Sequence, residues 1–482
     1  MSSASSPSSA CKKKLYALRP PSDPTARVET QRTYRERRLE AADPPSLERA
    51  VRQLLADKIS GTLVGLWLLV PEHLRLGTWD LLRTWTGQPT ANLEPRLALQ
   101  FVHEAALCVT GIRYGRGLSQ RGFEVANGLP FVAADPAIHD LLDAHTVAQA
   151  RTLQTALGLV RRARGHFRGV RIAIDPHRVR SWSQRQMRRH RSQHHQEESA
   201  HKVAQTFFAL DADTHEPIGL TTATASRTVS QATPELLDLI GPIVQPQASG
   251  GVLVLADGEH FTAELIEQLR QRSGWDFLVP LPNHAWRRQQ LAGWPEGQWT
   301  RRWAGFATAK VPLDSGGQPL FLFAQRCGER PEDYEYKSFG STRDGDEVQT
   351  LTDDFPSRWH IEEFFDAHQA LGWKRAGTLN LNVRYGQMSL ALVAQAALSQ
   401  LRQRLGEPYQ RWEADQFAKK VLGGLDGDVR VHQDTIVVTF YNAPAVEQMQ
   451  AHFAGLPDQL SAEGVDPHIP WLFNFKLDFR FK

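Results

Sequence analysis

Glu362 is the residue whose type and position best suit chemistry, because it borders the apolar face of a predicted helix. The segment from Phe355 to Trp373 is helical in pattern, and at 100° per residue one broad face carries Ile361, Phe364, Phe365, His368 and Leu371. Arg358 lies one turn before Glu362 on the same border, whereas Glu363 points away. A partly desolvated carboxylate suits metal binding or proton transfer. A solvated helix flank with a salt bridge is the simpler interpretation of this segment alone.

Two aspartates upstream follow strand patterns. Asp175 ends a β-branched run, and Pro176 is expected to stop that strand. Asp257 ends the apolar run Val252–Ala256, which is typical of a buried parallel strand. Catalytic groups of open α/β sheets gather at the carboxyl ends of strands, so we expect the two aspartates to lie side by side. A single aspartate at such a place is commonly a turn or cap residue, but two of them followed by a helical glutamate make a more specific pattern.

The residues between these acids predict a mixed α/β order of elements. Val203–Leu210 and Pro217–Ala223 are expected to form a hairpin across the turn Asp-Ala-Asp-Thr-His. A helix is expected to begin with Thr233 as its cap and Pro234 in its first position. A second helix and a further strand follow, at Thr262–Arg272 and Trp275–Leu281. The predicted order is strand, two strands, helix, strand, helix, strand.

This order of elements and acids resembles the ribonuclease-H-like DDE transposases of bacterial insertion sequences. The resemblance is to the group with a Tyr-x-x-Arg-x-x-x-Glu-x-x-x-x-x-x-Lys signature, and it covers residues 165 to 375. It implies that Asp175, Asp257 and Glu362 are the catalytic and metal-binding triad. It also implies that Arg358, at the position of the signature arginine, contacts a DNA phosphate near the scissile bond.

Two positions depart from that signature. Phe355 stands where the tyrosine is expected, which keeps the ring but loses the hydroxyl donor. Gln369 stands where the lysine is expected, which keeps a donor but loses the charge. Lys374 and Arg375 are nearby cations that can take over a DNA contact, although neither lies on the stripe of Glu362. Cleavage remains the expectation, while the detailed DNA contacts are open.

Three close carboxylates repel one another unless they are protonated or bound to metal, and Mg²⁺ prefers oxygen ligands. Two ions about 4 Å apart can activate the attacking oxygen and stabilise the leaving oxygen at a phosphodiester. We therefore expect two Mg²⁺ or Mn²⁺ ions. The expected activity is hydrolysis at a transposon end, followed by attack of the freed 3′ hydroxyl on target DNA. The expected partners are double-stranded transposon ends and target DNA, and the resemblance implies a homodimer on DNA.

The chain has 482 residues and a formal net charge of only +3, so total charge does not identify a nucleic-acid binder. Its arginines are concentrated instead around Asp175, at positions 161, 162, 164, 168, 171, 178, 180, 185, 188, 189 and 191. Such a density suits a phosphate backbone, and a solvated arginine-rich loop is an equal alternative. Four histidines in the same stretch, at 190, 194, 195 and 201, lack a matching cysteine and favour a solvated loop over a zinc site.

The sequence divides into five regions. Residues 1–44 are Ser/Pro-rich, then charged, and are expected to be disordered. Residues 45–160 have a helical pattern and are expected to bind DNA; two short helices, Ser119–Ala126 and Asp135–Ala144, either read DNA or simply pack. The catalytic domain is expected at 165–284 and 352–376, interrupted by a β-rich insertion at 285–351. Residues 377–482 form a C-terminal region, in which helix Met388–Leu405 is a candidate for dimerisation or packing.

Within the insertion, tryptophans alternate with arginines. Arg301 and Arg302 are expected to bind DNA, because aromatic and basic side chains together can stack an unpaired base and hold its phosphates. The tryptophans concerned are Trp286, Trp294, Trp299 and Trp303. Packing of a small β-domain is the simpler explanation for any one of them.

The fold class expected from the whole chain is therefore α/β, with a ribonuclease-H-like mixed sheet flanked by helices, an N-terminal all-α domain and a β-rich insertion. Scattered cysteines and the lack of a secretory signal favour a cytoplasmic, nucleoid-associated protein. Two alternatives stay open: a nuclease of the same fold without strand transfer, and a non-catalytic DNA-binding protein derived from a transposase. A glycosidase with two carboxylates would leave the third acid and the arginine-rich loop unexplained.

Overall fold

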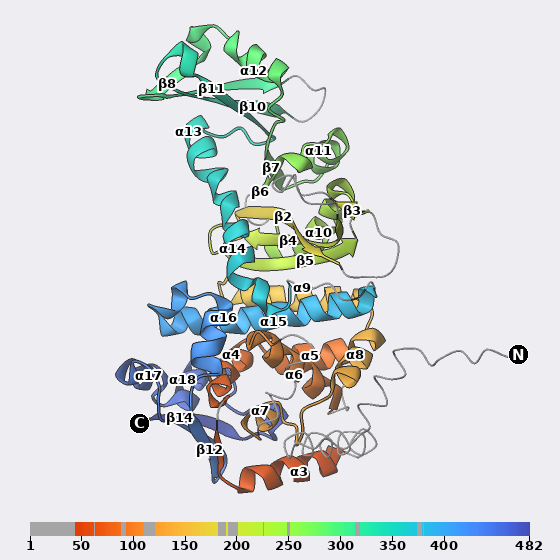
Figure 1. The fold of residues 1–482 in the computed structure, drawn as a ribbon, viewed down its shortest axis with the longest axis vertical. Helices are drawn as coiled ribbons and strands as arrows, with labels where there is room; N and C mark the ends of the chain where they lie inside the picture. Colours follow the sequence, from red (N-terminus) through yellow and green to blue (C-terminus); the bar gives the residue numbers. More distant parts are fainter. Residues whose placement is uncertain are drawn as a thin grey trace, which may run out of the picture.

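The computed structural model describes residues 44–61, 63–87, 93–109, 121–181, 189–190, 201–224, 226–247, 251–313, 319–373, 378 and 380–482. These residues form an elongated molecule in stacked layers (Figure 1). The β-rich insertion lies at one end, a large mixed sheet follows, a helical layer lies beneath it, and a small second sheet lies at the far end.

The core of the large sheet has the strand order β5-β4-β2-β6-β7. Its strands are β2 (Arg171–Arg180), β4 (His201–Asp211), β5 (Glu216–Thr224), β6 (Val252–Ala256) and β7 (Trp275–Pro280). β4 runs antiparallel to both β2 and β5, whereas β6 is parallel to β2 and β7 is parallel to β6. A two-residue strand, β3 (Arg189–His190), pairs with the start of β4. This arrangement is the ribonuclease-H-like fold that the sequence predicted.

β2 does not stop at Pro176, so that part of the prediction was wrong. The strand continues to Arg180, and Pro176 is paired in register with Phe207 of β4. The parallel pairing with β6 ends earlier, at Ile174 opposite Ala256. Beyond that point β2 has β4 as its neighbour on one side only, so a proline without an N–H group is accommodated.

Helices cover both faces of this sheet core. They include α9 (Val147–Ala163), α10 (Val229–Val244) and α11 (Ala263–Arg270). The expected start of α10 at Thr233 was wrong: Thr228 caps the helix in a capping box with Gln231, and Pro234 lies inside it. Pro234 is the sixth residue of this helix, where a proline removes one intrahelical hydrogen bond. The helix predicted at Thr262–Arg272 is confirmed as α11 with shorter ends, and the Thr262 side chain caps it.

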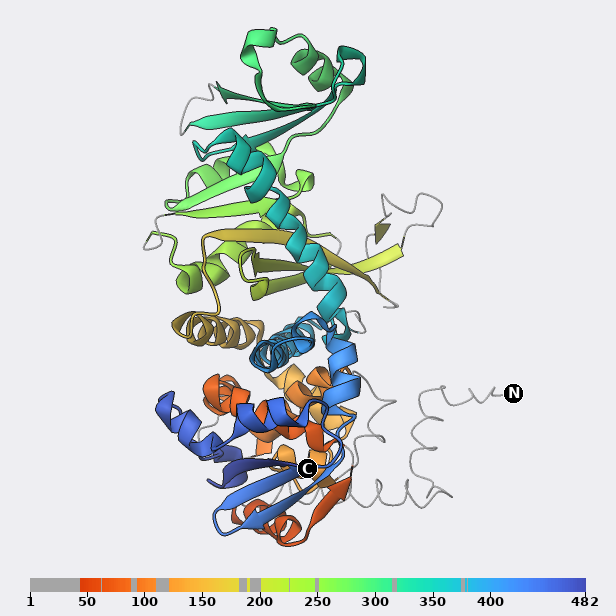
Figure 2. The same cartoon turned by 90° about the vertical axis from the view of Figure 1, so that its left-hand side faces the viewer.

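The segment with Glu362 is helical throughout but is not one regular helix. A 3₁₀ turn at Pro356–Trp359 leads into α14 (His360–His368), and a second 3₁₀ turn covers Gln369–Leu371. The predicted apolar face is confirmed, because Ile361, Phe364, Phe365, His368 and Leu371 are all buried. Together with α13 (Glu347–Gln349), this segment runs along one side of the sheet from the insertion to the helical layer (Figure 2).

The insertion continues the large sheet. β11 (Glu335–Ser341) pairs antiparallel with β7, and the order then runs through β10 (Leu320–Cys327), β9 (Phe306–Leu313) and β8 (Thr300–Trp303). α12 (Ala285–Ala292) lies above these strands (Figure 1). The two strands predicted here, at Phe306–Val311 and Leu320–Ala324, are therefore confirmed with longer ends.

The N-terminal helices and the C-terminal region pack together. The helices are α3 (Pro44–Ala56), α4 (Val70–Arg75), α5 (Thr78–Thr86), α6 (Leu93–Ala106), α7 (Arg121–Ala126) and α8 (Asp135–Ala144). β1 (Ile59–Gly61) joins a small sheet with β12 (Gly427–His432), β13 (Thr435–Phe440) and β14 (Lys476–Phe481). Two short helices, α17 (Val446–Phe453) and α18 (Leu456–Ala462), lie between β13 and β14, and α16 (Ala414–Phe417) precedes β12.

α7 lies inside this unit. All of its residues after Arg121 are buried, and the indole N–H of Trp471 donates to the Ala126 carbonyl at 2.9 Å. Gly128, just after the helix, has φ +65° and a backbone so close to Trp471 that a Cβ atom would collide with its carbonyl oxygen. For α7, these contacts support the packing alternative over DNA reading. DNA binding by the rest of 45–160 stays a prediction.

α15 (Leu381–Leu405) lies between the large sheet and the N-terminal helices (Figure 1). It reaches the sheet through Glu216, a buried carboxylate at the start of β5. Glu216 accepts hydrogen bonds from Ser399, Gln395 and Gln403 of α15 and pairs with the buried Arg161 of α9. Glu216 thus links β5 to both α9 and α15. None of the helices in the described part of the chain is both long and apolar enough to cross a membrane.

Replacing Arg161 with leucine should lower the free energy of unfolding by about 3–5 kcal/mol, because Glu216 would keep its charge in the core without a cation. Urea unfolding followed by circular dichroism measures the change. Arg411→Ala, which removes an exposed ion pair with Glu407, is the control and should change stability by under about 1 kcal/mol. Equal effects of the two substitutions would contradict the assigned role of Arg161.

Candidate active site

Asp175 and Asp257 lie side by side at the edge of the paired region between β2 and β6. The last paired residues are Ile174 and Ala256, and each aspartate is the next residue of its strand. Asp175 remains within β2 and is partly buried, whereas Asp257 is exposed and begins a 3₁₀ turn. The Asp257 carboxylate accepts the N–H of Gly258 at 2.7 Å, which fixes the side chain at the end of the strand. The parallel register therefore brings together two acids separated by 82 positions, as predicted.

Glu362 reaches the same place through Arg358. The guanidinium of Arg358 donates to Glu362 at 2.8 Å and lies 3.9 Å from an Asp175 oxygen. The Arg358 side chain is only 6% exposed, so its charge is directed at these acids. The two neighbouring glutamates differ as predicted: Glu362 is 41% exposed and faces Arg358, and Glu363 is 71% exposed.

The surroundings of Asp175 disfavour the charged form of its carboxylate. Burial raises the pKa of Asp175 to about 7. Arg358 counteracts this increase, whereas the carboxylates of Glu259, Asp257 and Glu362 add to it. A bound cation would favour the ionised form of Asp175, so the site suits a divalent metal ion.

The spacing of the carboxylates bears on which metal arrangement they suit. Among the described residues, the three acids do not form a group whose ligand oxygens all lie within 4.8 Å of one another. A site for two ions does not need such closeness, because its outer ligands each reach a different ion. Asp175 is next to Asp257 in register, and Arg358 lies close to both Asp175 and Glu362.

Glu259 is a fourth acid at the site that the sequence interpretation missed. It lies two residues after Asp257, contributes to the raised pKa of Asp175 and pairs with Arg178 of β2 at 2.6 Å. The spacing Asp-Gly-Glu after a buried strand was the available signal. The Glu259 carboxylate therefore already has a cationic partner, Arg178, in the structure.

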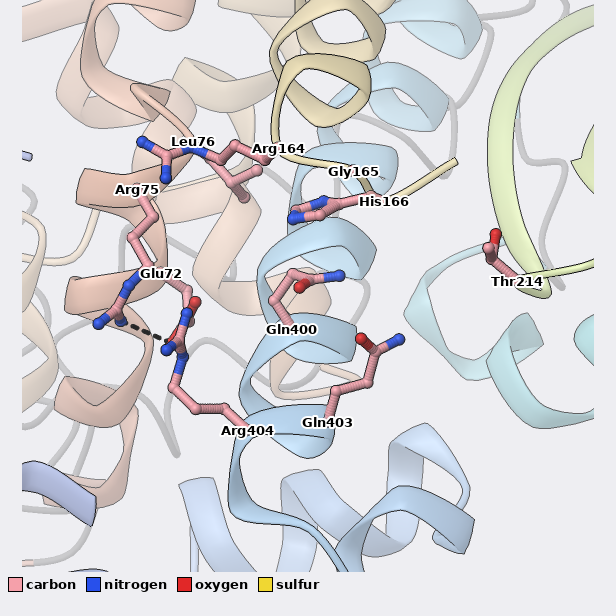
Figure 3. A pocket seen from close by; sticks show the side chains of 10 residues that line it. All are labelled: Glu72, Arg75, Leu76, Arg164, Gly165, His166, Thr214, Gln400, Gln403 and Arg404. Carbon is pink, nitrogen blue, oxygen red and sulfur yellow. Dashed lines mark hydrogen bonds and ion pairs between the residues drawn. The ribbon is translucent and has the colours of Figure 1, made fainter. Parts of the chain in front are cut away.

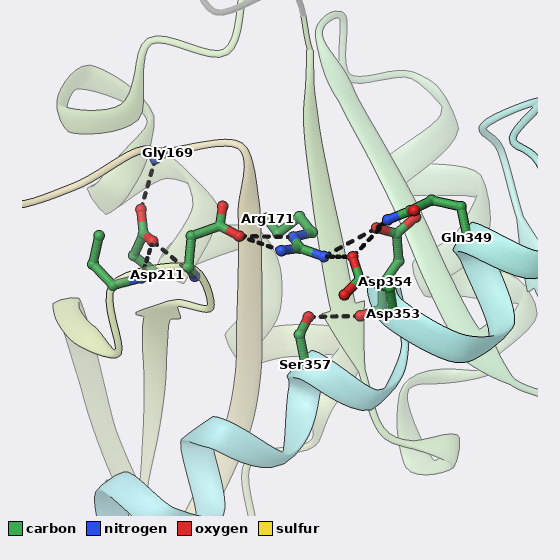
Figure 4. Close-up of polar contacts among 9 residues, drawn as sticks. Gly169, Arg171, Asp211, Gln349, Asp353, Asp354 and Ser357 are labelled. Carbon is green, nitrogen blue, oxygen red and sulfur yellow. Dashed lines mark hydrogen bonds and ion pairs between the residues drawn. The ribbon is translucent and has the colours of Figure 1, made fainter.

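Arg171, at the start of β2, also has a structural role. It pairs with Asp213 in the turn between β4 and β5, and with Asp353 at 2.6 Å and Asp354 at 3.2 Å just before the Glu362 segment (Figure 4). At the end of β4, Asp211 accepts the N–H of Gly169 at 2.6 Å. The network therefore ties the strand of Asp175 to the segment that delivers Glu362.

The arginine-rich stretch accordingly contributes more to structure than its sequence indicated. Arg161, Arg171 and Arg178 each pair with an acid, and Arg162 donates to the carbonyl of Ile243 at 2.7 Å. Arg185, Arg188 and Arg191 lie outside the described residues, so the predicted phosphate-binding loop remains a prediction.

The other predicted DNA-binding residues differ in their surroundings. Arg301 is exposed, whereas Arg302 donates to Thr308 at 2.8 Å and pairs with Glu347 at 2.9 Å. Lys374 lies outside the described residues. Phe355, at the place of the signature tyrosine, packs against Phe339 with ring centroids 4.6 Å apart, so its ring belongs to the junction with the insertion.

A cavity of about 490 Å³ lies away from the three acids, between the end of α9, the β4–β5 turn, α4 and α15 (Figure 3). Its lining comprises Glu72, Arg75, Leu76, Arg164, Gly165, His166, Thr214, Gln400, Gln403 and Arg404. Arg75 and Arg404 both pair with the buried Glu72 at 2.9 Å, so much of its charge is internally balanced. This cavity contains none of the predicted catalytic residues.

Comparison with known proteins identifies the segment that holds the acids. Residues 166–396, just under half of the chain, match the family model described as "Transposase DDE domain". This segment is a transposase DDE domain. Asp175, Asp257 and Glu362 all lie within the DDE domain, whose type implies catalytic phosphoryl transfer and which generally uses divalent metal ions.

Other comparisons add little to the DDE domain match. No curated protein sequence is detectably similar to the chain. Among solved structures, a piggyBac transposase synaptic complex with hairpin DNA is similar at 11% sequence identity, covering 76% of this chain and 82% of that chain with a TM-score of 0.35. A TM-score this low does not establish a common fold.

Without divalent metal, Asp175→Asn in the DDE domain should stabilise the protein at neutral pH. The pKa of Asp175 is raised to about 7 in the folded state, above about 3.9 in the unfolded chain. Between these values the folded state binds the extra proton, so the contribution of Asp175 to stability falls as pH rises. The free energy of unfolding of the variant, relative to that of wild type, should increase by about 1–3 kcal/mol when the pH rises from roughly 5 to 8.

Urea unfolding in a chelator at both pH values measures this difference. Asp366→Asn is the control, because Asp366 is an exposed acid on α14. Its stability should change with pH as that of wild type does. A wild-type protein and an Asp175→Asn variant with the same pH dependence would show that Asp175 ionises normally.

Proposed function

We propose that this protein is a transposase of the insertion-sequence type that cleaves transposon ends and joins them to target DNA, with Asp175, Asp257 and Glu362 as its catalytic acids. The observation that carries the proposal is the meeting of these acids inside a transposase DDE domain: two by strand register and the third through Arg358. The acids come from a strand, a strand end and a helix, in the order of the DDE motif.

Asp175, Asp257 and Glu362 would hold two Mg²⁺ or Mn²⁺ ions. Such ions lower the pKa of a bound water or hydroxyl and stabilise the charge of the leaving oxygen. Asp175 contributes the shared position between the other acids, and its partial burial keeps bulk water away from one side of the site. Because hydrolysis and strand transfer are both in-line displacements at phosphorus, one set of acids serves both steps. No covalent protein–DNA intermediate is required.

Arg358 acts on the acids as a positioning residue. Its contacts with Asp175 and Glu362, and its nearly complete burial, favour this role over the direct phosphate contact that the signature implied. The cation lowers the pKa of Asp175, which keeps a larger fraction of that carboxylate ionised and ready to bind metal.

Exposed aromatic rings next to Arg358 and on the insertion are candidates for contact with the DNA. Trp359 follows Arg358 in sequence and is 55% exposed, so an apolar ring faces solvent beside the acids. In the insertion Trp286 and Trp303 are also exposed, and Arg287 lies 4.4 Å from the Trp286 ring. Exposed indoles beside arginines can stack an unpaired base and neutralise its phosphate.

The catalytic assignment predicts that Asp257→Asn and Glu362→Gln each reduce Mg²⁺-dependent strand cleavage by at least about 100-fold, because each removes a charged metal ligand. DNA binding, measured by fluorescence anisotropy in Ca²⁺, should remain. Asp257→Asn keeps an oxygen that can accept the Gly258 N–H, which separates loss of charge from loss of the turn. Asp366→Asn should cleave like wild type.

A joining assay with pre-cut ends distinguishes a transposase from a nuclease of the same fold. The transposase should produce joined product from a 3′-hydroxyl end and a target plasmid. Cleavage without any joined product would favour the nuclease. DNA binding with neither reaction would favour a non-catalytic protein derived from a transposase.

Arg358→Gln should shift the pH profile of cleavage toward higher pH. Loss of the guanidinium raises the pKa of Asp175 further, so the carboxylate ionises and binds metal only in more alkaline solution. Cleavage rates measured across pH at fixed Mg²⁺ give the midpoint. A lower rate with an unchanged midpoint would mean that Arg358 contacts DNA and does not act through Asp175.

A further inference from the structure

A second group of potential metal ligands lies beside the active site but faces away from the three acids. His215, His360 and Glu363 each offer one ligand atom, and these atoms all lie within 4.8 Å of one another. Nδ1 of His360 is 3.0 Å from an oxygen of Glu363, and the rings of His215 and His360 stack with centroids 3.7 Å apart. Two imidazoles and a carboxylate thus meet at one point of the surface.

We propose that His215, His360 and Glu363 form a binding site for a zinc-type transition-metal ion that fastens the β4–β5 turn to the first turn of α14. Imidazole nitrogen is the ligand that distinguishes Zn²⁺ and related ions from Mg²⁺, which prefers oxygen. Three protein ligands leave a fourth position for water, which is a common zinc arrangement. The site is separate from the acids assigned to the two Mg²⁺ ions.

The spacing suits such an ion. Ligand atoms about 2.0–2.1 Å from one tetrahedral ion lie roughly 3.3 Å apart, and the His360–Glu363 separation is already close to that value. His360 and Glu363 are three residues apart on α14, so they project from the same side of the helix. The histidine rings are inclined by 27°, and the broad χ2 torsion of each ring allows both nitrogens to turn to a shared ion.

The third ligand is held in place by the structure of the turn. Asp211 accepts the backbone N–H groups of Asp213 and Thr214 at 3.0 Å each, and the N–H of His215 donates to the Asp211 carbonyl at 2.8 Å. His215 itself has φ +60°, which directs its ring out of the turn toward α14. A preformed turn reduces the ordering cost of binding an ion.

The site has a consequence for Glu362, the neighbour of Glu363 on the same helix turn. Arg171 already links the β4–β5 turn to the segment before α14 (Figure 4). A metal ion at the proposed site would link the same turn to α14 itself. Occupancy would therefore hold the start of α14, and with it Glu362, against the sheet.

Titration of the chelator-treated full-length protein with ZnCl₂ tests the proposal, with excess Mg²⁺ present to occupy the three acids. Isothermal calorimetry should show one zinc site that weakens by at least about 10–100-fold in His215→Asn and in Glu363→Gln. Asparagine is chosen because it tolerates the left-handed backbone of position 215. His468→Ala removes an exposed histidine that pairs with Asp466, and this control should bind as wild type does.

The melting temperature provides a second measurement. Zinc should raise it in wild type and in His468→Ala but not in the two site variants, since an ion stabilises only the state that binds it. Equal melting temperatures of all proteins without metal would show that the variants fold. Zinc binding that is unchanged in both site variants, including binding by the histidines at 190, 194, 195 and 201, would overturn the proposal, as would no binding by wild type. The titration contains no DNA, so its outcome is independent of the transposase proposal.

Discussion

Mutual repulsion of carboxylates is the constraint on which the arrangement of this molecule depends. Four acids converge at the end of the β2–β6 pairing, and the structure supplies two arginines against them: Arg358, between Asp175 and Glu362, and Arg178, on Glu259. Burial raises the pKa of Asp175 to about 7, and the neighbouring carboxylates add to this increase. Carboxylates without enough cationic partners favour the binding of metal cations. Bound metal ions would in turn favour the binding of a polyanion.

The same pairing of charges explains why a chain with many arginines has so few of them free around its acids in the described regions. Arg161 and Arg171 bind acids that lie 40 or more residues away, and each joins two or more layers. Their function in the fold is to fix strands and helices relative to one another. If the proposed function holds, exposed groups such as Trp359 and Arg301 are better placed to contact DNA than the paired Arg161 and Arg171.

Much of the catalytic core was predictable because its signals are local. The buried run Val252–Ala256 ends at Asp257 as a parallel strand should, and the helical period placed Glu362 at the border of a buried face. Other features depend on distant partners. Pro176 lies inside β2 only because β6 has already ended beside it, which no local pattern contains. The partners of Arg358 and the approach of His215 to α14 likewise depend on tertiary contacts. The capping box of Thr228 and Gln231, in contrast, was legible in the sequence and was overlooked in favour of Pro234.

The pairing of β11 with β7 makes the inserted strands part of the same sheet that carries Asp257 one strand further on. A domain attached by flexible linkers could change its distance from the acids, whereas strands that are hydrogen-bonded within one sheet move together. A nucleotide bound by the exposed Trp286 and Trp303 would therefore lie at a fixed distance from the acids. The insertion would then fix the distance between its DNA contact and the scissile phosphate.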